Sequence, residues 1–339
     1  PALGRAYGTH TYTITAGAED GHFALASASS GAVEVSAALD RETKDVYQLG
    51  IQVFDGVYTI DVNLTISLLD VNDNRPVFLT PSPIETPENE PANTSVLTLN
   101  VTDADIGENA DVVFALVSAV FAGDNSDATH VFAIDPATGE LTNLQELDYE
   151  QPDEREFVLS VSVANTALSP TGATLARNAI YTVRLTDRND NKPVFVGPPE
   201  ESLSVLENAT VGTQLTTVSA PDADGSALYS TVAYSIVSGN AEGLFAVNSQ
   251  TGAVTVVQAL DFEKTSFFSL RIEASDGELS SFKLLNVTVV DVNDVRPKFV
   301  QREYTAYVFE NVTGQVELAQ VTAVDKDSGV RGTVSYSIV

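Results

Sequence analysis

The chain has 339 residues, 47 of them acidic and 17 basic, which gives a formal net charge of −30 at pH 7. This charge excludes nucleic acid as an expected partner, because binding to phosphates needs clustered Lys and Arg. There is no Cys to indicate a redox compartment. We expect neither a membrane span nor a signal peptide within these residues, since no long apolar run or basic leader occurs.

From residue 7 onward the sequence reads as short strands separated by Gly, Asp, Ser and Pro turns. The strictest alternation of apolar and polar residues spans 47–53, 157–163 and 268–274. Period-two alternation places one set of side chains in a core and the other toward solvent. No helical periodicity of comparable strength is present, so the pattern predicts an all-β chain of sandwich domains without long helices.

An acidic motif occurs three times, each time after an alternating strand and before Pro and Phe, at 70–78, 187–195 and 291–299. The copies lie about one hundred residues apart, which is the size of a small domain. Proline ends a sheet ladder and stiffens the chain, so each copy is predicted to be a linker at a strand exit. A single copy would be an ordinary polar turn. Three copies in register favour a functional role.

Three further acidic motifs recur once per unit. They are Leu-Asp-x-Glu at 39–42, 147–150 and 260–263, Asp-x-Asp at 103–105, 222–224 and 325–327, and Glu-Asn at 88–89, 207–208 and 310–311. Oxygen ligands without Cys or clustered His point to a hard cation, and Ca²⁺ accepts more protein oxygens than Mg²⁺ does. Ions at the linkers would join successive units and offset their mutual repulsion.

With these motifs in register, together with Ala-x-Asp at 274–276, the chain resembles a tandem array of extracellular cadherin repeats. The resemblance implies Ig-like, Greek-key, seven-stranded β-sandwiches joined by calcium-binding linkers into an elongated rod. It also implies about three Ca²⁺ ions at each complete joint. The repeats it assigns are a partial repeat at 1–78, complete repeats at 79–195 and 196–299, and the start of another at 300–339.

The resemblance also assigns metal ligands by position. At the first joint they are Asp40, Glu42, Val71, Asn72, Asp73, Asn74, Asp103, Asp105, Asn109 and Asn165. At the second joint they are Glu88, Asp148, Glu150, Arg188, Asn189, Asp190, Asn191, Asp222, Asp224, Tyr229 and Asp276. At the third joint they are Glu207, Asp261, Glu263, Val292, Asn293, Asp294, Val295, Asp325, Asp327 and Arg331. Val71, Asn74, Asn109, Arg188, Asn191, Tyr229, Val292, Val295 and Arg331 are expected to contribute backbone carbonyls.

The chain departs from the family pattern at four of these positions. Asn165 replaces an aspartate and removes one charge from the first joint, which we expect to weaken its outermost ion. Val295, Tyr229 and Arg331 replace asparagines at carbonyl positions, where little should change. The first joint also lacks the glutamate that the preceding Glu-Asn motif would supply.

The leading functional hypothesis is a segment of a calcium-dependent cell-adhesion ectodomain at the cell surface. Its expected partners are other cadherin-type ectodomains or the rest of its own array, and any membrane contact would come from a segment outside these residues. The alternative is a structural or mechanical extracellular spacer with the same ions and no adhesive surface. No nucleophile or phosphate-binding motif supports an enzyme. Six Asn-x-Ser/Thr sequons offer sites for glycosylation: Asn63, Asn93, Asn100, Asn208, Asn286 and Asn311.

The two ends fall at the same phase of the repeat, because residues 8–14 align with residues 332–338. We expect a window of a longer array. Alternatively, residues 300–339 of one copy would complete the first repeat of the next by strand addition, which would propagate a filament.

Overall fold

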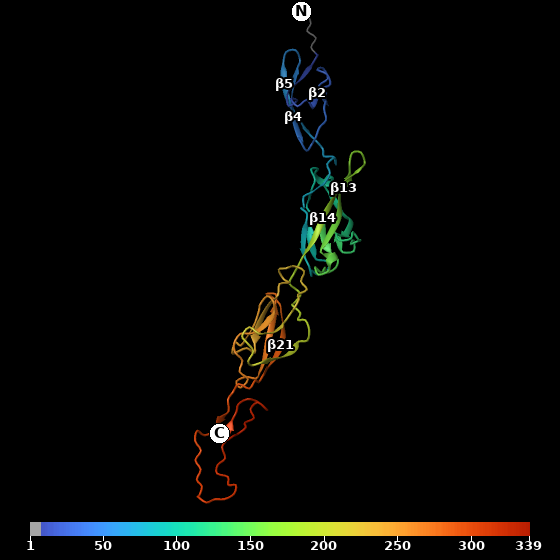
Figure 1. The fold of residues 1–339 in the computed structure, drawn as a ribbon. Coiled ribbons are helices and arrows are strands. Elements are labelled where there is room, and N and C mark those ends of the chain that lie inside the picture. The colour runs from blue at the N-terminus through green and yellow to red at the C-terminus, as the bar shows by residue number, and fades with distance from the viewer. Residues whose placement is uncertain (1–7) are drawn as a thin grey trace, which may run out of the picture. The chain divides into compact units, whose positions relative to one another are not determined.

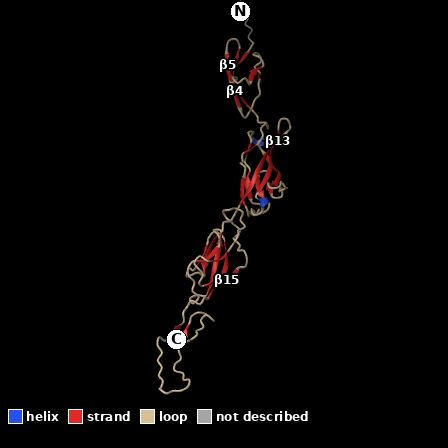
Figure 2. Ribbon diagram, viewed as in Figure 1, coloured by secondary structure: helices blue, strands red, loops and turns tan. Residues whose placement is uncertain are grey.

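The computed structural model describes residues 8–339, and its regular structure is almost entirely β-strand (Figure 2). Within this range the only helical segments are two short 3-10 turns, η1 (Gly107–Asn109) and η2 (Pro152–Glu154). No helix among these residues is long and apolar enough to cross a membrane. The chain divides into two compact units at the boundary between Thr186 and Asp187. The prediction of an all-β chain is therefore confirmed.

Residues 8–76 of the first predicted repeat form five strands, and its residues 1–7 lie outside the described range. One antiparallel sheet has the order β1-β4-β5, with β1 at Thr11–Ala16, β4 at Val46–Phe54 and β5 at Thr59–Ser67. A separate hairpin pairs β2 (Phe23–Leu25) with β3 (Val33–Val35). In Figure 1 β4 and β5 lie side by side, and the alternation of residues 47–53 buries Tyr47, Leu49 and Ile51 in a small core with Phe23.

The second repeat is a two-sheet sandwich of seven strands. Its larger sheet has the order β10-β13-β14-β7, with bounds Val112–Phe121, Glu156–Leu168, Thr174–Thr186 and Ile84–Pro87. The smaller sheet has the order β11-β12-β8, with bounds Phe132–Ile134, Glu140–Asn143 and Ser95–Thr98. In these two sheets β7 joins β14 in parallel, and the other pairings are antiparallel. A short pair, β6 (Val77–Phe78) with β9 (Val101–Thr102), ties the linker to this repeat.

Strand β13 shows why this sequence folds as it does. Phe157, Leu159, Val161 and Val163 face the core and are fully buried or nearly so, while the residues between them face outward. Burying one such side chain contributes about 1.5–3 kcal/mol relative to leaving it exposed. The aromatic ring of Phe157 packs against Phe132 with ring centroids 5.0 Å apart in an edge-on arrangement. This local alternation therefore sets both the strand and its buried face.

The third repeat has the same plan. Its larger sheet has the order β15-β21-β20-β17, with bounds Glu200–Leu206, Ser280–Val290, Phe267–Ser275 and Ala233–Ser238. Its smaller sheet has the order β16-β19-β18, with bounds Gln214–Thr217, Ala253–Val256 and Phe245–Val247. Here β15 joins β21 in parallel, as β7 joins β14 in the second repeat.

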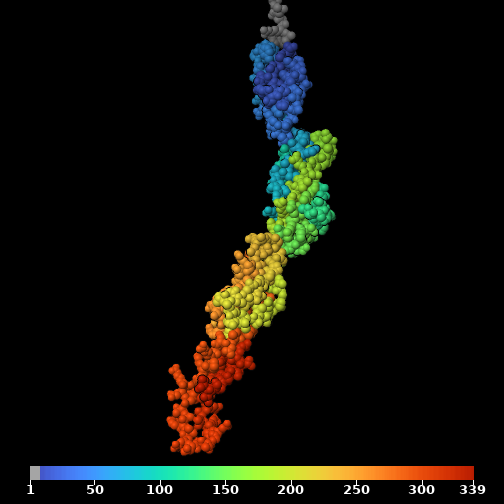
Figure 3. All heavy atoms as spheres, viewed as in Figure 1, coloured from blue at the N-terminus to red at the C-terminus, as the bar shows by residue number. Residues whose placement is uncertain are grey.

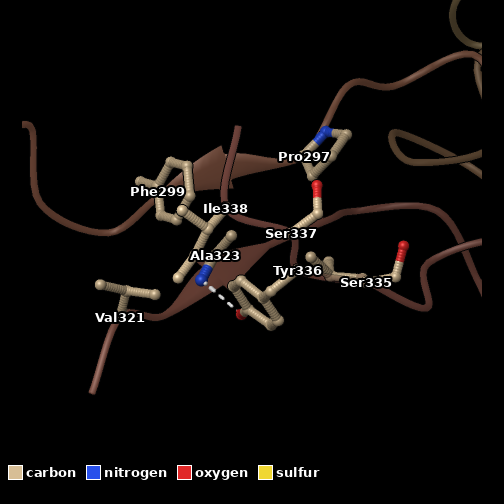
Figure 4. Close-up of a pocket in the computed structure, with 9 residues that line it drawn as sticks. Pro297, Phe299, Val321, Ala323, Ser335, Tyr336, Ser337 and Ile338 are labelled. Carbon is tan, nitrogen blue, oxygen red and sulfur yellow. Dashed lines mark hydrogen bonds between the residues drawn. The ribbon is translucent and has the colours of Figure 1, made fainter. Parts of the chain in front are cut away.

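The last residues repeat the start of the third repeat. A short pair joins β22 (Lys298–Phe299) to β23 (Ala323–Val324), and the Tyr336 hydroxyl accepts a hydrogen bond of 2.9 Å from the Ala323 amide (Figure 4). In the third repeat the Tyr234 hydroxyl accepts the Ala220 amide at 2.8 Å in the same way. A linker phenylalanine lies near each tyrosine ring, with centroid distances of 6.3 Å and 6.4 Å. The start of the third repeat and the last residues of the chain therefore hold an equivalent tyrosine in the same way.

The β13–β14 hairpin is longer than its counterparts. Both of its strands have 13 residues, whereas β4 and β5 have 9 each and β20 and β21 have 9 and 11. The pairing is irregular between Ala164 and Leu168, so the chain bulges at residues 165–167. The hairpin tip forms the yellow-green lobe beside the cyan linker in Figure 3, and the bulge brings it to the first joint.

Candidate metal centres

The first joint gathers carboxylates from three separate segments. Glu42 precedes β4, Asp73 lies in the linker after β5, and Asp105 follows β9. One oxygen from each of the three lies within 4.8 Å of the others. Asp105 is buried, so its charge is poorly screened by solvent. The arrangement favours a bound cation, because three carboxylates this close otherwise repel one another.

The linker backbone is fastened to the same cluster. The Asn74 amide N–H donates to Asp105 at 3.2 Å, and the Asn74 side-chain amide donates to Asp105 at 2.7 Å and to Asp73 at 2.8 Å. The Asp105 N–H in turn donates to Asp103 at 3.1 Å. Asp40 stands apart as an exposed side chain whose carboxylate accepts the Thr43 N–H and hydroxyl.

Asn165 lies at the outer part of this joint, where only 3% of it is exposed. Its side-chain amide donates to the Asp103 carboxylate and to the Asn109 carbonyl, both at 2.9 Å. The Asn72 amide donates to the Ala167 carbonyl at 2.7 Å. The bulge of the long hairpin therefore supplies direct hydrogen bonds to this joint.

Arg41 is a further participant that the sequence analysis did not assign. Its guanidinium lies 2.5 Å from Asp70 and 2.6 Å from Glu42, and it donates to the Ala104 carbonyl at 3.2 Å. Burial alone would raise the pKa of Asp70, but hydrogen bonds from Asn109 and the Ile106 amide, together with Arg41, lower it. The first joint thus contains a positive charge of its own, at the position that Tyr149 and Phe262 occupy in the later motifs.

At the second joint, the assigned residues lie in both compact units, and each unit holds its own cluster. In the first unit, oxygens of Glu88, Asp148 and Glu150 lie within 4.8 Å of one another. Glu88 is fully buried and accepts the Tyr149 N–H at 2.6 Å. Asp148 accepts the Glu150 N–H at 2.8 Å, which holds the Asp148 carboxylate against the backbone of this motif.

In the second unit, oxygens of Asp222, Asp224 and Asp276 form another such group. The Asn191 N–H donates to Asp224 at 3.0 Å, and the Asn191 side-chain amide donates to Asp190 at 2.6 Å. The same pattern occurs at Asn74 in the first joint. Two copies of one linker motif therefore fold onto the following Asp-x-Asp in the same way.

At the third joint, oxygens of Glu207, Glu263 and Asp294 lie within 4.8 Å of one another. Glu207 is buried and accepts the Phe262 N–H at 2.7 Å and the Val292 N–H at 2.5 Å. It is therefore held by both the Leu-Asp-x-Glu segment and the linker. Asp261, on the other hand, is exposed and accepts the Lys264 N–H at 2.9 Å.

The remaining assigned residues of the third joint also meet. The Val295 N–H donates to Asp327 at 3.2 Å, and the Asp327 N–H donates to Asp325 at 3.0 Å. Val295 replaces the asparagine of the other linkers, yet its backbone makes the contact that Asn74 and Asn191 make. The Asn293 amide donates to the Arg331 carbonyl at 3.2 Å. The carbonyl assignments at this and the other joints remain predictions.

The first aspartate of each linker motif has a structural role that the sequence analysis also missed. Asp70 accepts the Ile106 N–H at 3.0 Å, Asp187 accepts the Ser226 N–H at 2.6 Å, and Asp291 accepts the Ser328 N–H at 2.8 Å. Each bond holds the loop after Asp-x-Asp against the linker. The same aspartate begins all three linker motifs, and this recurrence in the sequence could have indicated its role.

Three carboxyls in these clusters have raised pKa values. Burial is the main cause for Asp222, with repulsion from Asp224 and Asp276 in addition. Burial again comes first for Glu263, beside Glu207 and Asp294, and for Asp327, beside Asp325 and Asp291. A bound cation would reverse these shifts, because it favours the charged form.

Several buried oxygens at the joints have no hydrogen-bond donor. They belong to Asn72, Asn165, Asn189, Asp222, Asp224, Glu263, Asp276 and Asp327. An unsatisfied buried acceptor costs about 1–3 kcal/mol, and a cation would supply the missing partner. Every one is an oxygen from a carboxylate or an amide, the ligand type that Ca²⁺ takes in numbers of six to eight. The residues present therefore fit calcium.

The fold and the site together define a class of protein: tandem β-sandwich repeats with carboxylate clusters at the repeat boundaries. The Cadherin domain model matches residues 82–186 and 201–292. Human protocadherin Fat 4 is 33% identical over 316 residues, and human protocadherin-16 is 35% identical over 343 residues. These matches cover 91% and 99% of this chain. The chain belongs to the cadherin family, which confirms the resemblance seen in its motifs.

The solved structures agree with this assignment. The crystal structure of mouse cadherin-23 EC22-24 matches with a TM-score of 0.51 and 28% identity, covering 86% of this chain and 89% of that one. The curated relatives are much longer proteins, since the match spans 6% of protocadherin Fat 4 and 10% of protocadherin-16. The repeats of this chain are therefore those of a cadherin ectodomain.

Proposed function

We propose that the chain is an extracellular, calcium-binding segment of a cell-adhesion ectodomain, with repeats bounded as 1–78, 79–195, 196–299 and 300–339. Calcium ions at the joints, about three where a joint is complete, neutralise the clustered carboxylates and make successive repeats stiff relative to one another. Binding, rather than catalysis, is the role of these carboxylates. The observation that carries the proposal is the recurrence of the buried oxygens without donors at the boundaries.

The joints are where calcium should have the largest effect. The second and third repeats each have a separate apolar core, which includes none of the joint carboxylates. The clusters at the joints consist of like charges that hold one another poorly without a cation. Calcium that binds the folded joints stabilises them in proportion to the logarithm of its free concentration.

Calorimetric titration of the whole chain with calcium tests the proposal. Asp294→Asn removes one carboxylate from the third-joint cluster and should abolish or weaken one class of sites. Glu146→Gln makes the same change of charge at an exposed position outside the assigned ligands and should leave the titration unchanged. Equal titrations for both variants would contradict the proposal, as would the absence of binding to the unmodified chain.

Adhesion and a passive spacer role share this calcium chemistry, so a separate measurement is needed to distinguish them. Beads coated with the chain should aggregate in calcium and disperse in chelator if the segment is itself adhesive. A chain that binds calcium without aggregating beads would favour the spacer role for this segment.

A further inference from the structure

One face of the second repeat differs from the rest of this acidic chain. It is the outer face of the sheet β10-β13-β14-β7. Along β13 the outward residues Val158, Ser160, Ser162 and Ala164 are all uncharged, and so are the residues that they pair with on β10 and β14. Near the centre of this face Ile180, the partner of Ser160, is 70% exposed.

Strand β10 extends the same surface. Val113, opposite Ala164, is 41% exposed, and Val117 bulges outward between two paired residues and is 56% exposed. Charged side chains return at one end of the sheet, where Glu156 lies 3.5 Å from Arg184. Glu85 of β7, which pairs with Arg184, and Asp127, which bridges to Val120, lie at the same end. The result is a flat, uncharged patch of small and apolar side chains.

The equivalent faces of the other repeats are unlike it. In the third repeat, Glu273 accepts the Ser235 hydroxyl, and Arg271 lies 3.8 Å over the Phe282 ring. In the first repeat, Asp61 accepts the Gln52 amide on the corresponding face.

Sequons mark the same difference. Asn63 on β5 and Asn286 on β21 lie on the outward faces of their sheets, and each begins an Asn-x-Thr acceptor. The patch of the second repeat contains no sequon. It therefore lacks both the charge and the acceptor for a bulky glycan that its counterparts have.

We propose that this patch is a contact surface for a second copy of the same chain. The two copies pack face to face about a two-fold axis that passes close to Ile180. A second copy carries the same net charge, which is −30 before calcium binds and stays negative with about three Ca²⁺ at each joint, so most surfaces of the two chains repel each other. An uncharged patch avoids that repulsion and is self-complementary under a two-fold axis, which places equal surfaces against each other. The proposal deepens the proposed adhesive function by naming its surface.

The size of the patch predicts the strength of the contact. Strands about 4.8 Å apart, with about 3.3 Å per residue along each, give residues 158–164 and their partners on two neighbouring strands a face of roughly 330 Å² for each copy. Two copies would bury roughly 700 Å², which is less than stable specific interfaces bury. The association should therefore be weak and reversible, as suits a contact that many copies make together.

Sedimentation velocity of the whole chain in calcium tests this inference. The unmodified chain should show reversible dimerisation as its concentration increases. Ile180→Asp should weaken dimerisation at least tenfold, because the new charges face each other near the axis. Leu144→Asp makes the same change in the same repeat, at a side chain 40% exposed and outside this sheet, and should have no effect. Equal effects of the two variants, or a chain that stays monomeric, would overturn the proposal.

A charge-pair experiment separates a lost contact from a damaged fold. Ile180→Lys alone should also fail to dimerise, but a mixture of the Lys and Asp variants should form heterodimers. If both variants melt like the unmodified chain and the mixture stays monomeric, the face is not the contact. Calcium titration of the same samples reports the proposed function separately, because a chain that binds calcium but stays monomeric refutes only this inference.

Discussion

The side-chain amide of Asn165 donates a hydrogen bond to the Asp103 carboxylate at 2.9 Å, where the second joint has Asp276 beside Asp222 and Asp224. An amide at this position replaces repulsion between carboxylates with a direct attraction. The first joint is thereby held partly by the protein itself, while the group around Asp222 depends more on a cation.

Asn165→Asp should make the first joint bind calcium more tightly and make it less stable without calcium. Calcium should bind the first joint more tightly, on the order of tenfold, because an added ligand charge raises affinity. In chelator the variant should melt at a lower temperature, since the hydrogen bond to Asp103 becomes a repulsion. Calorimetric titration and thermal melts measure the two effects. Asn165→Ala serves as the control, because it removes the hydrogen bond without adding a charge. An unchanged affinity would show that Asn165 is wrongly assigned to the site.

Asp222→Asn should raise the melting temperature without calcium and lower it with calcium. Burial and the neighbouring carboxylates raise the pKa of Asp222, so the stability linked to this group is present at low pH and is lost as the pH rises through the raised folded value. At neutral pH without calcium, removing the charge should therefore raise the melting temperature. With calcium the same variant loses a ligand and should melt lower than the unmodified chain. Melting curves in chelator and in calcium test this, and a shift of the same sign in both would contradict it.

Chelation should change the joints more than the strands. We expect far-ultraviolet circular dichroism to remain nearly constant, because the sheets are held by apolar cores and backbone pairing. The melting temperature should fall, and small-angle scattering should report greater freedom between repeats. A scattering profile that is identical with calcium and with chelator would refute a stiffening role for the ions.

Phe157→Ala should destabilise the second repeat by about 3–5 kcal/mol, the usual cost of truncating a buried aromatic residue. Phe157 is fully buried and packs against Phe121 and Phe132. Because this core does not include the joint carboxylates, the loss should be similar with calcium and with chelator. Denaturant unfolding under both conditions measures it, with Val158→Ala on the outer side of the same strand as the control. A loss confined to chelator would show that core and joints are not independent.

The strands and the composition of the candidate sites could be predicted from the sequence. The alternation around Phe157 and Leu159 is a local property, since neighbouring residues on a strand always face opposite sides. The acidic motifs recur in register, so their proximity followed from repetition of one fold. Glu42, Asp73 and Asp105 accordingly lie together, although more than 60 residues separate the first from the last.

Other features depended on the tertiary structure. Lys283 on β21 is a charged residue at an inward-facing position of its strand. It is only 4% exposed, and its ammonium lies 3.0 Å from the Glu201 carboxylate on the neighbouring strand. The contact between Asn72 and Ala167 arises because the β13–β14 hairpin is long and bulged, which no residue in the linker specifies. Periodicity and recurrence determined the strands, the repeats and the residue types at each joint. Strand register, hairpin length and burial determined which polar groups satisfy one another, because those contacts join segments distant in the sequence.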